Sequence, residues 1–326
     1  MGNYTHELEK MGVEMIISPF YQSIDEFLNA RGGEFDAFYI TRYHVVNEMV
    51  PQIRAVNPEA PVIMNNADLH YLRMLRKAVA EKDETQLEAA RDVRELELAA
   101  MRSVDLVLSY NDKEHAVIEA QSEGMVKVMT CPWVLNTPDT IPPREGRQGL
   151  SFLGGFQHHP NVEGVEWFAK SVMQELGSSR PDLHLSLYGS RMGADVKALE
   201  ADNITPVGFI EDPADSYDNH LVFVAPLLSG AGIKGKVLGA LAHGIPCVLS
   251  PMAAEGIGLR HGLDAMIADT PLEWVNAITQ VHDDPELWEK LSQNGHALAK
   301  TQFSFEGGKE KMRAAFEAIG LFAHHT

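Results

Sequence analysis

The chain has 326 residues, 45% of them apolar and 22% charged, a composition typical of a globular protein with two domains of about 150 residues each. Its 27 basic and 46 acidic residues give a net charge of −19. This balance argues against nucleic acid as a partner, because nucleic-acid binding needs a basic surface, and it disfavours docking on anionic lipid unless positive charge is clustered locally.

No apolar run approaches the roughly 20 residues that a membrane-spanning helix needs, and the polar N-terminus is unlike a signal or transit peptide. The two cysteines, Cys131 and Cys247, lie beside apolar residues and prolines, which favours buried free thiols over a disulfide. We therefore expect a cytoplasmic protein. An acidic protein that binds an anion must use a few well-placed cations and backbone N–H groups, so such a cluster is the first feature to look for.

Apolar runs of strand length alternate with helical patterns along the chain, which predicts parallel sheets with helices on both faces. The predicted strands are Val13–Ile17, Ala37–Ile40, Pro61–Met64, Leu106–Leu108, Lys127–Met129, Leu150–Leu153, Leu183–Tyr188, Val207–Phe209, Leu221–Ala225, Pro246–Leu249 and Ala265–Ala268. The charged segment Thr85–Arg102 predicts an amphipathic surface helix whose apolar stripe is formed by Ala89, Val93, Leu96 and Ala100.

The one break in composition is Cys131–Gly149, which contains four prolines and separates two arrays of alternating strands and helices. We predict a first domain over residues 1–135, a linker over 136–149 and a second domain over 150–305. The remaining residues, 306–326, predict a C-terminal helix that can pack back on the first domain.

The clearest candidate site follows the predicted strand Leu221–Ala225. The chain passes through a glycine-rich turn, Ser229–Gly232, into a helix whose buried stripe is formed by Ile233, Val237, Ala240 and Leu241. Free N–H groups at a helix start, with glycines that permit close approach, form an anion site. Lys234 and Lys236 oppose the helix dipole at this end, which makes sense if a phosphate is to be held there. The alternative is a solvated helix start with an ordinary loop.

Two glycines inside this helix, Gly235 and Gly239, each cost roughly 1 kcal/mol relative to alanine, which suggests that another group approaches the helix surface closely. Helical spacing places Lys236, Gly239 and His243 on one face, which we expect to point toward a cleft. His243 is then either a ligand contact or a structural residue at the helix end.

A second glycine turn follows the predicted strand Pro246–Leu249 and carries a carboxylate, Glu255. Ligands of doubly wound sheets bind beyond the carboxyl ends of the strands, so both turns are expected to point into the same crevice. Glu255 can accept hydrogen bonds from sugar hydroxyls there, or it can cap a helix.

The run PLLSGAGIKGKVLGALAHGIPCVLSPMAAEGIG resembles the donor-binding signature of glycosyltransferase family 4 and its close relatives. LSFLGGFQHHPNVEGVEWF is similar to the first strand and helix of the same domain, and VGFIED to the strand end that contacts the nucleotide base. The resemblance covers nearly all of Leu150–Ile319. It implies that the donor is bound by Gly155, Phe209, Ile210, Ser229, Gly230, Ala231, Gly232, Lys234, Lys236, Gly239 and Gly256.

Upstream, FDAFYITRYHVV and PVIMNNADLHYLR resemble strand ends that face the cleft in this family. The resemblance implies that Asp68, His70 and Arg73 lie near the donor sugar, and that Asp68, His70 and Glu255 take part in catalysis.

The resemblance implies a GT-B fold, in which two Rossmann-like, doubly wound domains face each other and the second binds a nucleotide-diphosphate sugar. It also implies transfer with retention of configuration and without a metal or other cofactor, because N–H groups and lysines stabilise the departing diphosphate. The expected partners are the nucleotide sugar and a saccharide or lipid-linked glycan acceptor. Peripheral membrane association, a multi-subunit assembly and a homo-oligomer stay open.

Two features depart from the family pattern. The glutamates of its E-x7-E motif are missing, since Ser229 stands near the first position and Gly239 at the second, so we expect a weakened or rearranged ribose site. The first domain also starts late, because nothing before Val13 can supply the further strand and glycine-rich loop of the family. We therefore expect a first domain truncated at its N-terminus: the chain is a fragment, its sheet is smaller, or another chain completes it.

Other chemistries fit less well. The sequence has no P-loop and no G-x-S-x-G elbow. His158 and His159 have no Cys or carboxylate at ligand spacing, so no metal site is expected. A carboxylate-pair glycosidase is permitted by spacing but leaves the turn with its lysines unexplained. Two classes remain: an active glycosyltransferase, and a non-catalytic carbohydrate-binding or scaffold subunit of a glycan synthase.

Overall fold

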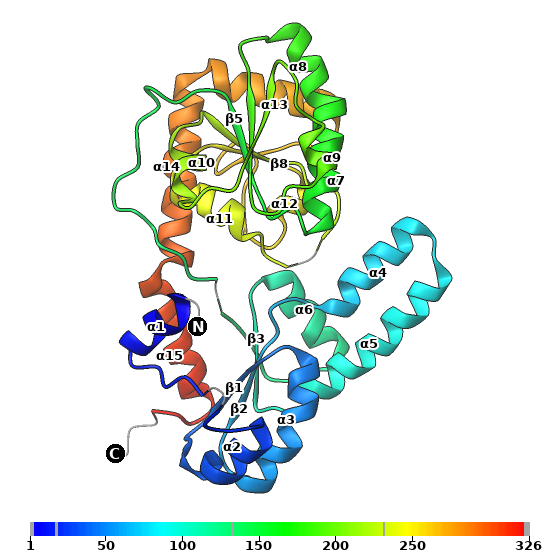
Figure 1. Ribbon diagram of the computed structural model, residues 1–326, viewed down its shortest axis with the longest axis vertical. Helices are drawn as coiled ribbons and strands as arrows, with labels where there is room; N and C mark the ends of the chain where they lie inside the picture. The colour runs from blue at the N-terminus through cyan, green and yellow to red at the C-terminus, as the bar shows by residue number, and fades with distance from the viewer. Residues whose placement is uncertain (1–2, 17–18, 132, 231, 323–326) are drawn as a thin grey trace.

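The computed structural model describes residues 3–16, 19–131, 133–230 and 232–322. They form two α/β domains, each built on a parallel sheet, which meet along one side (Figure 1). The predicted fold class and the division of the chain into two arrays of strands are therefore confirmed. Cys131 and Cys247 are both buried, as predicted.

The first domain holds a four-stranded parallel sheet in the order β1-β2-β3-β4. Its elements are α1 (Asn3–Lys10), α2 (Ile24–Arg31), the 3-10 helix η1 (Gly32–Glu34), β1 (Phe38–Thr41), α3 (Tyr43–Val56), β2 (Val62–Asn65), α4 (His70–Glu81), α5 (Glu84–Arg102), β3 (Leu106–Ser109), α6 (Asp112–Gln121) and β4 (Val128–Thr130). Every residue of β2 and β3 is buried, because helices cover both faces of these strands. This double burial explains why the strands are continuous apolar runs in the sequence.

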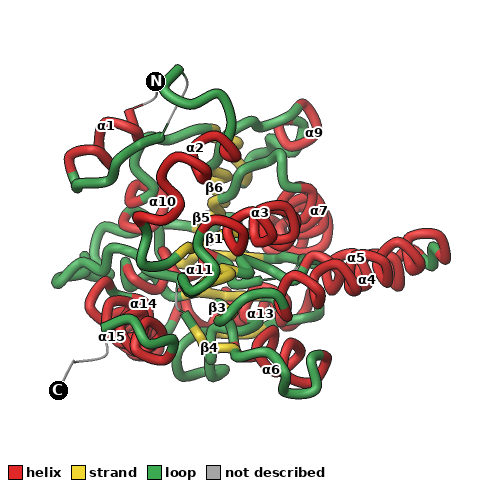
Figure 2. Tube along the Cα trace, turned by 90° about the horizontal axis from the view of Figure 1, so that it is seen from below, coloured by secondary structure: helices red, strands yellow, loops and turns green. Residues whose placement is uncertain are grey.

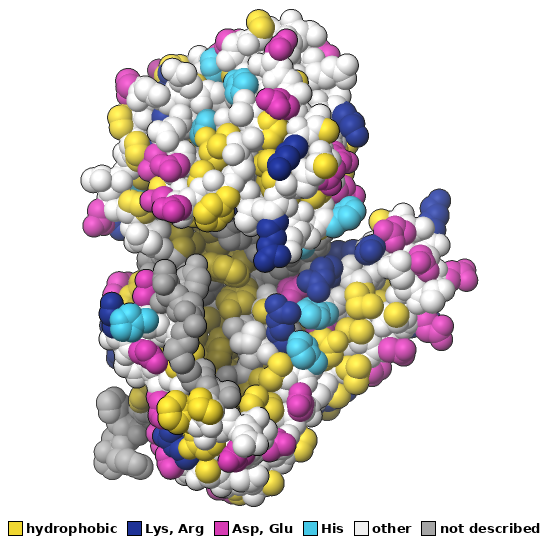
Figure 3. All heavy atoms as spheres, in the orientation of Figure 1, with side chains coloured by type: hydrophobic (Ala, Val, Ile, Leu, Met, Phe, Trp, Pro, Cys, Tyr) yellow, Lys and Arg dark blue, Asp and Glu magenta, His cyan; other side chains and the backbone are white. Residues whose placement is uncertain are grey.

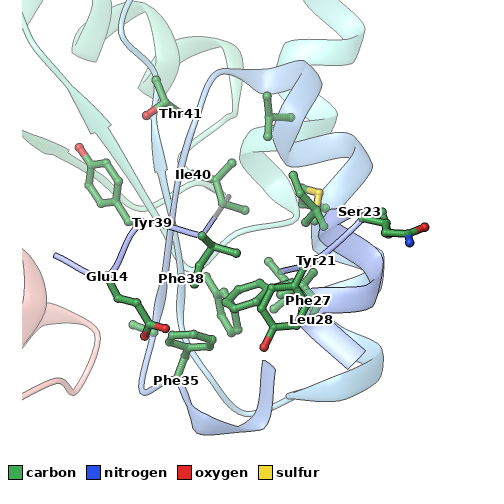
Figure 4. A pocket seen from close by; sticks show the side chains of 17 residues that line it. Glu14, Tyr21, Ser23, Phe27, Leu28, Phe35, Phe38, Tyr39, Ile40 and Thr41 are labelled. Atoms are coloured by element: carbon green, nitrogen blue, oxygen red, sulfur yellow. The ribbon is translucent and has the colours of Figure 1, made fainter. Parts of the chain in front are cut away.

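The predicted strand Val13–Ile17 is wrong for residues 13–16, which form neither helix nor strand, and residue 17 lies outside the described part of the chain. No strand of the described residues pairs with this segment, so its side chains stay accessible, with Val13 44% exposed. Between the segment and β1 lies a cavity of about 820 Å³ (Figure 4). Its wall is mainly apolar and includes Phe27, Leu28, Phe38, Ile40, Met49 and Ile53.

The second domain holds a six-stranded parallel sheet in the order β10-β9-β8-β5-β6-β7. The order reverses where β5 pairs with both β6 and β8, which makes the carboxyl ends of β5 and β8 the expected place for a ligand. Its elements are β5 (Leu150–Leu153), α7 (His159–Phe168), the π-helical turn η2 (Ala169–Met173), α8 (Gln174–Ser179), β6 (Leu185–Tyr188), α9 (Ala194–Lys197), β7 (Ile204–Gly208), α10 (Ala214–Asp218), β8 (Val222–Ala225), α11 (Gly235–Ala242), β9 (Cys247–Leu249), α12 (Pro251–Ala254), β10 (Met266–Ile267), α13 (Pro271–Asp283), α14 (Pro285–Phe303) and α15 (Phe305–Ala318).

The segment 131–149 joins the two sheets without a helix or strand in its described residues. Its end is held by Arg147, which is 5% exposed and donates hydrogen bonds to four backbone carbonyls, two within the segment and two in the second domain. After α14 the chain returns to the first domain, where α15 packs on the sheet (Figure 1). There Ala315 joins Leu106 and Leu108 in one buried cluster, so the last helix covers the face that α3 and α5 leave open.

Helices α4 and α5 form a hairpin that projects from the first domain, and both views show them side by side (Figures 1 and 2). The predicted amphipathic helix is confirmed, but its buried face is only partly as predicted. Ala100 is buried and Val93 packs on the core, whereas Leu96 is 51% exposed. Ala90, Glu97, Leu98 and Met101, which the predicted stripe omits, are also buried. The buried face is set by contact with α4 and α3, and it includes an acidic residue that the apolar pattern cannot reveal. No helix of the described residues is both long and apolar enough to cross a membrane.

Candidate functional site

The turn after β8 lies against the first domain. Its last residue, Gly232, has a left-handed backbone (φ +69°), and its N–H donates to Oε1 of Glu114 in α6 at 3.0 Å. A Cβ at Gly232 would lie 3.4 Å from Cβ of Asp68, so the glycine permits both the turn and the approach of the other domain. We call Ser229–Gly232 the glycine turn, and Ala231 within it lies outside the described residues.

Lys234 and Lys236 follow this turn and extend in different directions. Lys234 is 8% exposed and donates to the Gly232 carbonyl, while Lys236 donates to Oδ1 of Asn161 and lies 4.5 Å from the ring centre of Phe152. Burial lowers the pKa of Lys234 to about 8, and burial together with the positive Lys234 lowers the pKa of Lys236 to about 7. Both ammonium groups are desolvated, and a desolvated cation gains from binding an anion.

The loop after β5 lies beside Lys236. Asn161 bridges the two, since its amide donates to the Gly155 carbonyl at 2.7 Å and accepts from Lys236. A Cβ at Gly154 would lie 2.7 Å from Nζ of Lys236, so only glycine leaves room for the lysine. The structure thus brings Gly155 to the same place as Lys236, and it adds Asn161, which the sequence shows only as the second residue of a Pro-Asn pair.

His158 comes from the same loop, at the start of α7. Burial lowers its pKa, and the positive charges of Lys236, Arg73 and Lys234 lower it further, so these four side chains are close in space. Our sequence analysis considered His158 only as a metal ligand and missed its place beside the lysines. Its proximity to Arg73, which comes from the other domain, could not be deduced from sequence spacing.

The first domain contributes Asp68 and His70 from the segment after β2. Nε2 of His70 lies 3.3 Å from Oδ1 of Asp68, and Arg73 donates to the other oxygen of Asp68. Burial lowers the pKa of His70 despite the opposing charge of Asp68, so the ring is neutral near pH 7 and can donate or accept a proton. Asn66, beside them, is 2% exposed, and its amide has no hydrogen-bond partner in the described residues.

Glu97 of α5 holds His70 in place. Its carboxylate accepts the backbone N–H groups of His70 and Tyr71, both at 2.9 Å, and so caps a helix whose N-cap, Leu69, offers no side-chain acceptor. The side chain is 1% exposed, and burial raises the pKa of Glu97 to about 7. This buried carboxylate is a second residue that the sequence analysis missed, because a glutamate in a charged helix reads as solvent-exposed.

Glu255 joins the two domains. Both of its oxygens bind Arg76 of α4, at 2.9 and 2.8 Å, and Lys113 of α6 lies 3.5 Å away. Burial alone would raise the pKa of Glu255, but the Arg76 guanidinium outweighs it and holds the pKa below its usual value. Beside this ion pair, a Cβ at Gly256 would lie 2.6 Å from Cβ of Asn111, so the second glycine turn is also pressed against the first domain.

One expectation about helix α11 is wrong, and one alternative that the sequence left open is decided. Gly239 does not face the cleft, because a Cβ there would lie 2.7 Å from Oη of Tyr217, a residue that is 3% exposed. His243, on the same face, has its Nδ1 2.9 Å from Oδ1 of Asp218, which supports the structural interpretation. The place where the family presents its second glutamate is therefore filled by an aromatic ring from α10.

The remaining predicted residues are spread around the carboxyl ends of the strands. Ser229 donates to Glu163 of α7 at 2.7 Å, and the Gly230 carbonyl accepts from Arg76 at 3.3 Å. Strand β7 starts three residues earlier than predicted and ends at Gly208. Phe209 follows it with 71% of its surface exposed, and Ile210 is partly buried.

Basic side chains thus gather where the domains meet, in a protein whose net charge is −19. Figure 3 shows Lys, Arg and His side chains together at this junction, and we call His70, Arg73, His158, Lys234 and Lys236 the basic cluster. The described residues hold no group of three or more His, Cys, Asp or Glu side chains that could bind a metal ion.

Comparison with known proteins agrees with this geometry. Residues 147–284 match the family described as glycosyl transferases group 1. A 127-residue stretch is 28% identical to an uncharacterised 44.6 kDa protein in the cps region of Klebsiella pneumoniae and covers 36% of this chain. The match spans 33%, or about a third, of the length of that curated relative.

Solved structures share the fold of the whole chain. Sucrose-phosphate synthase from Thermosynechococcus elongatus has a TM-score of 0.71 at 17% identity, with 91% of this chain and 77% of that chain covered. Anabaena HepE in complex with UDP and glucose has a TM-score of 0.69 at 13% identity, with 97% and 89% covered. The pneumococcal O-GlcNAc transferase GtfA in complex with UDP and GlcNAc has a TM-score of 0.66 at 14% identity, with 92% and 61% covered. Residues 147–284 thus match the glycosyl transferases group 1 family, within a chain that has the GT-B fold.

Proposed function

We propose that this protein transfers a sugar from a nucleoside-diphosphate donor to a saccharide or lipid-linked acceptor. The observation that carries the proposal is the basic cluster beside the glycine turn, at the edge where the carboxyl ends of both sheets meet. The family match supports a nucleotide-sugar donor. So do two of the similar structures, which are complexes with UDP and glucose and with UDP and GlcNAc.

In this proposal the diphosphate lies at the start of α11, where Lys234 and Lys236 face it and no side chain caps the helix. Transfer places negative charge on the departing diphosphate, and the lysines and N–H groups stabilise that charge as it forms. They supply the positive charge that a metal ion provides elsewhere, which supports a reaction without a resident metal.

The first domain supplies groups on the sugar side of the same junction. Asp68 and His70 come from the segment that touches Gly232, so they stand close to the bond that breaks. A neutral imidazole can hydrogen-bond the sugar or the leaving oxygen. Phe209, exposed at the end of β7, offers a flat surface on which a nucleotide base can stack. We further propose retention of configuration, which rests on the family resemblance.

The large cavity along β1 bears on the acceptor. It reaches Thr41 at the carboxyl end of β1, and the next residue, Arg42, contributes to lowering the pKa of His70 (Figure 4). Its apolar wall suits the hydrocarbon part of a lipid-linked acceptor.

Nucleotide binding tests the proposal directly. UDP, GDP, ADP and dTDP are screened by thermal shift, because a ligand of the folded state raises apparent stability, and the best is measured by calorimetry. The double variant Lys234→Ala/Lys236→Ala should bind it at least about tenfold more weakly, since charge-assisted hydrogen bonds contribute about 1.5–3 kcal/mol each.

The matched control is Lys197→Ala, which removes an exposed lysine of α9 in the same domain. Unchanged affinity in the folded double variant would refute the diphosphate site. Slow hydrolysis of the matching nucleotide sugar supports a transferase, whereas saccharide binding without turnover would support the non-catalytic alternative.

A further inference from the structure

A second, smaller cavity lies at the domain junction, behind the ion pair of Arg76 with Glu255. Its volume is about 420 Å³, within the roughly 300–1,000 Å³ of small-molecule sites. Its wall comes from both domains and includes Leu72, Arg76, Lys113, Glu114, Ala116 and Glu255. Two carboxylates and two cations therefore line one space.

Glu114 is the residue in this wall whose hydrogen bonding is incomplete. It is 3% exposed, its Oε1 accepts the Gly232 N–H at 3.0 Å, and its Oε2 is buried with no hydrogen-bond partner in the described residues. The side chain is held firmly, because its helix is capped by Asn111 and its first oxygen is bound to the glycine turn. A buried acceptor that is fixed and has no partner calls for an explanation, and a ligand hydroxyl in the adjoining cavity is one.

The balance of charges indicates which ligand. A second phosphate would be repelled by Glu114 and Glu255, and a cation would be repelled by Arg76 and Lys113. Hydroxyl groups both donate and accept hydrogen bonds, so a neutral polyhydroxyl ligand can use all four side chains. A sugar has this chemistry.

The second domain, in turn, has no carboxylate within its own glycine turn, and the carboxylate that reaches the turn from α7, Glu163, is bound to Ser229. Neither position of the E-x7-E motif carries a glutamate, and Tyr217 fills the space beside Gly239. Glu114 brings a carboxylate to Gly232 from the opposite domain, 118 residues away in the sequence.

We propose that Glu114 recognises the sugar of the donor: Oε1 positions the glycine turn while Oε2 accepts a hydrogen bond from a sugar hydroxyl seated in this cavity. The inference rests on the proposed function, since it assumes a nucleotide sugar at the junction. It goes further by assigning sugar recognition to a residue of the first domain.

The test compares two ligands on the same protein. Calorimetry measures the nucleoside diphosphate that binds best among UDP, GDP, ADP and dTDP, and then its glucose and N-acetylglucosamine conjugates. We define the sugar increment as the affinity for the nucleotide sugar divided by the affinity for the nucleoside diphosphate. In Glu114→Gln the amide oxygen can still accept the Gly232 N–H, but the NH₂ group cannot accept a hydroxyl. We expect the increment to fall about tenfold or more, with diphosphate affinity changed less than about threefold.

A second variant tests the cavity without touching the carboxylate. Ala116 is exposed and lines the cavity, so Ala116→Phe fills it from the surface with little risk to the fold. It should also abolish the increment and spare the diphosphate. The control is Glu119→Gln, which removes an exposed charge from the same helix and should leave both affinities unchanged.

The outcomes separate this inference from the proposed function. If no diphosphate binds wild type, the proposed function falls and the inference with it. If the diphosphate binds but both variants keep the full increment, the sugar lies elsewhere and only the inference is overturned. If Glu114→Gln tightens the diphosphate itself, the carboxylate occupies the phosphate position, and that result also overturns it.

Discussion

The two lysines beside the glycine turn predict how nucleotide affinity should depend on pH. The pKa is lowered to about 7 for Lys236 and to about 8 for Lys234, because burial disfavours both ammonium groups. A diphosphate needs the charged form, so the free protein must first take up protons at high pH. Nucleotide affinity should therefore fall as pH rises through this window.

The magnitude follows from the two pKa values. Between pH 7.5 and 9.0 the protonated fraction falls roughly 20-fold for Lys236 and roughly eightfold for Lys234, or roughly 200-fold if both charges are required. The histidines of the basic cluster do not add to this change, because lowered pKa values leave His70 and His158 neutral throughout the range. The nucleotide does not add to it either, since its terminal phosphate titrates near pH 6, as phosphate esters do at about that value.

Calorimetric titration of the best nucleoside diphosphate at pH 7.5, 8.0, 8.5 and 9.0 measures how steeply its affinity falls with pH. Lys236→Met should bind more weakly at pH 7.5, and between pH 7.5 and 9.0 its affinity should fall only roughly eightfold, the part of the change that belongs to Lys234. Lys197→Met, on an exposed lysine of α9, should keep the full change. A wild-type affinity that is flat from pH 7.5 to 9.0 would refute the assignment of these lysines to the diphosphate.

Three further substitutions test the geometry. Gly239→Glu should lower the stability of the protein by about 1–3 kcal/mol in thermal unfolding, because its side chain meets the buried Tyr217; tighter nucleotide binding in a stable variant would contradict this. Arg76→Met breaks the ion pair with Glu255, which is partly exposed, so we expect a loss of about 1 kcal/mol and a larger radius of gyration in X-ray scattering; an unchanged scattering curve would show that other contacts hold the domains together. His70→Ala should reduce turnover about 100-fold or more while nucleotide affinity stays nearly constant, and full activity would remove His70 from the reaction.

Much of the fold could be predicted because it depends on local pattern. Strands such as β3 and β8 are buried on both faces, and their continuous apolar runs mark them in the sequence. Such a run was not sufficient for residues 13–16, which have no neighbouring strand among the described residues. A strand needs a partner for its backbone groups, and its own sequence does not supply one.

The residues of the candidate site also fall into two groups, those that local sequence predicts and those that only tertiary contacts reveal. The glycine turn and its two lysines lie within eight residues, Ser229–Lys236, so composition and spacing alone could indicate an anion site. Glu97 and Glu114 could not be identified in this way, because charged residues in helices are usually exposed, and only contact with α4 and with Gly232 buries these two.

The sequence by itself determined the alternation of strands and helices, the two arrays and the glycine turn predicted to bind phosphate, since each depends on residues that are near one another in the chain. Tertiary structure alone decided what meets that turn. It joined Arg76 to Glu255 across 179 residues, filled the face of Gly239 with Tyr217, and returned α15 to the first sheet. These contacts depend on how two domains pack, and packing is governed by shape and charge between segments whose separation in the sequence carries no pattern.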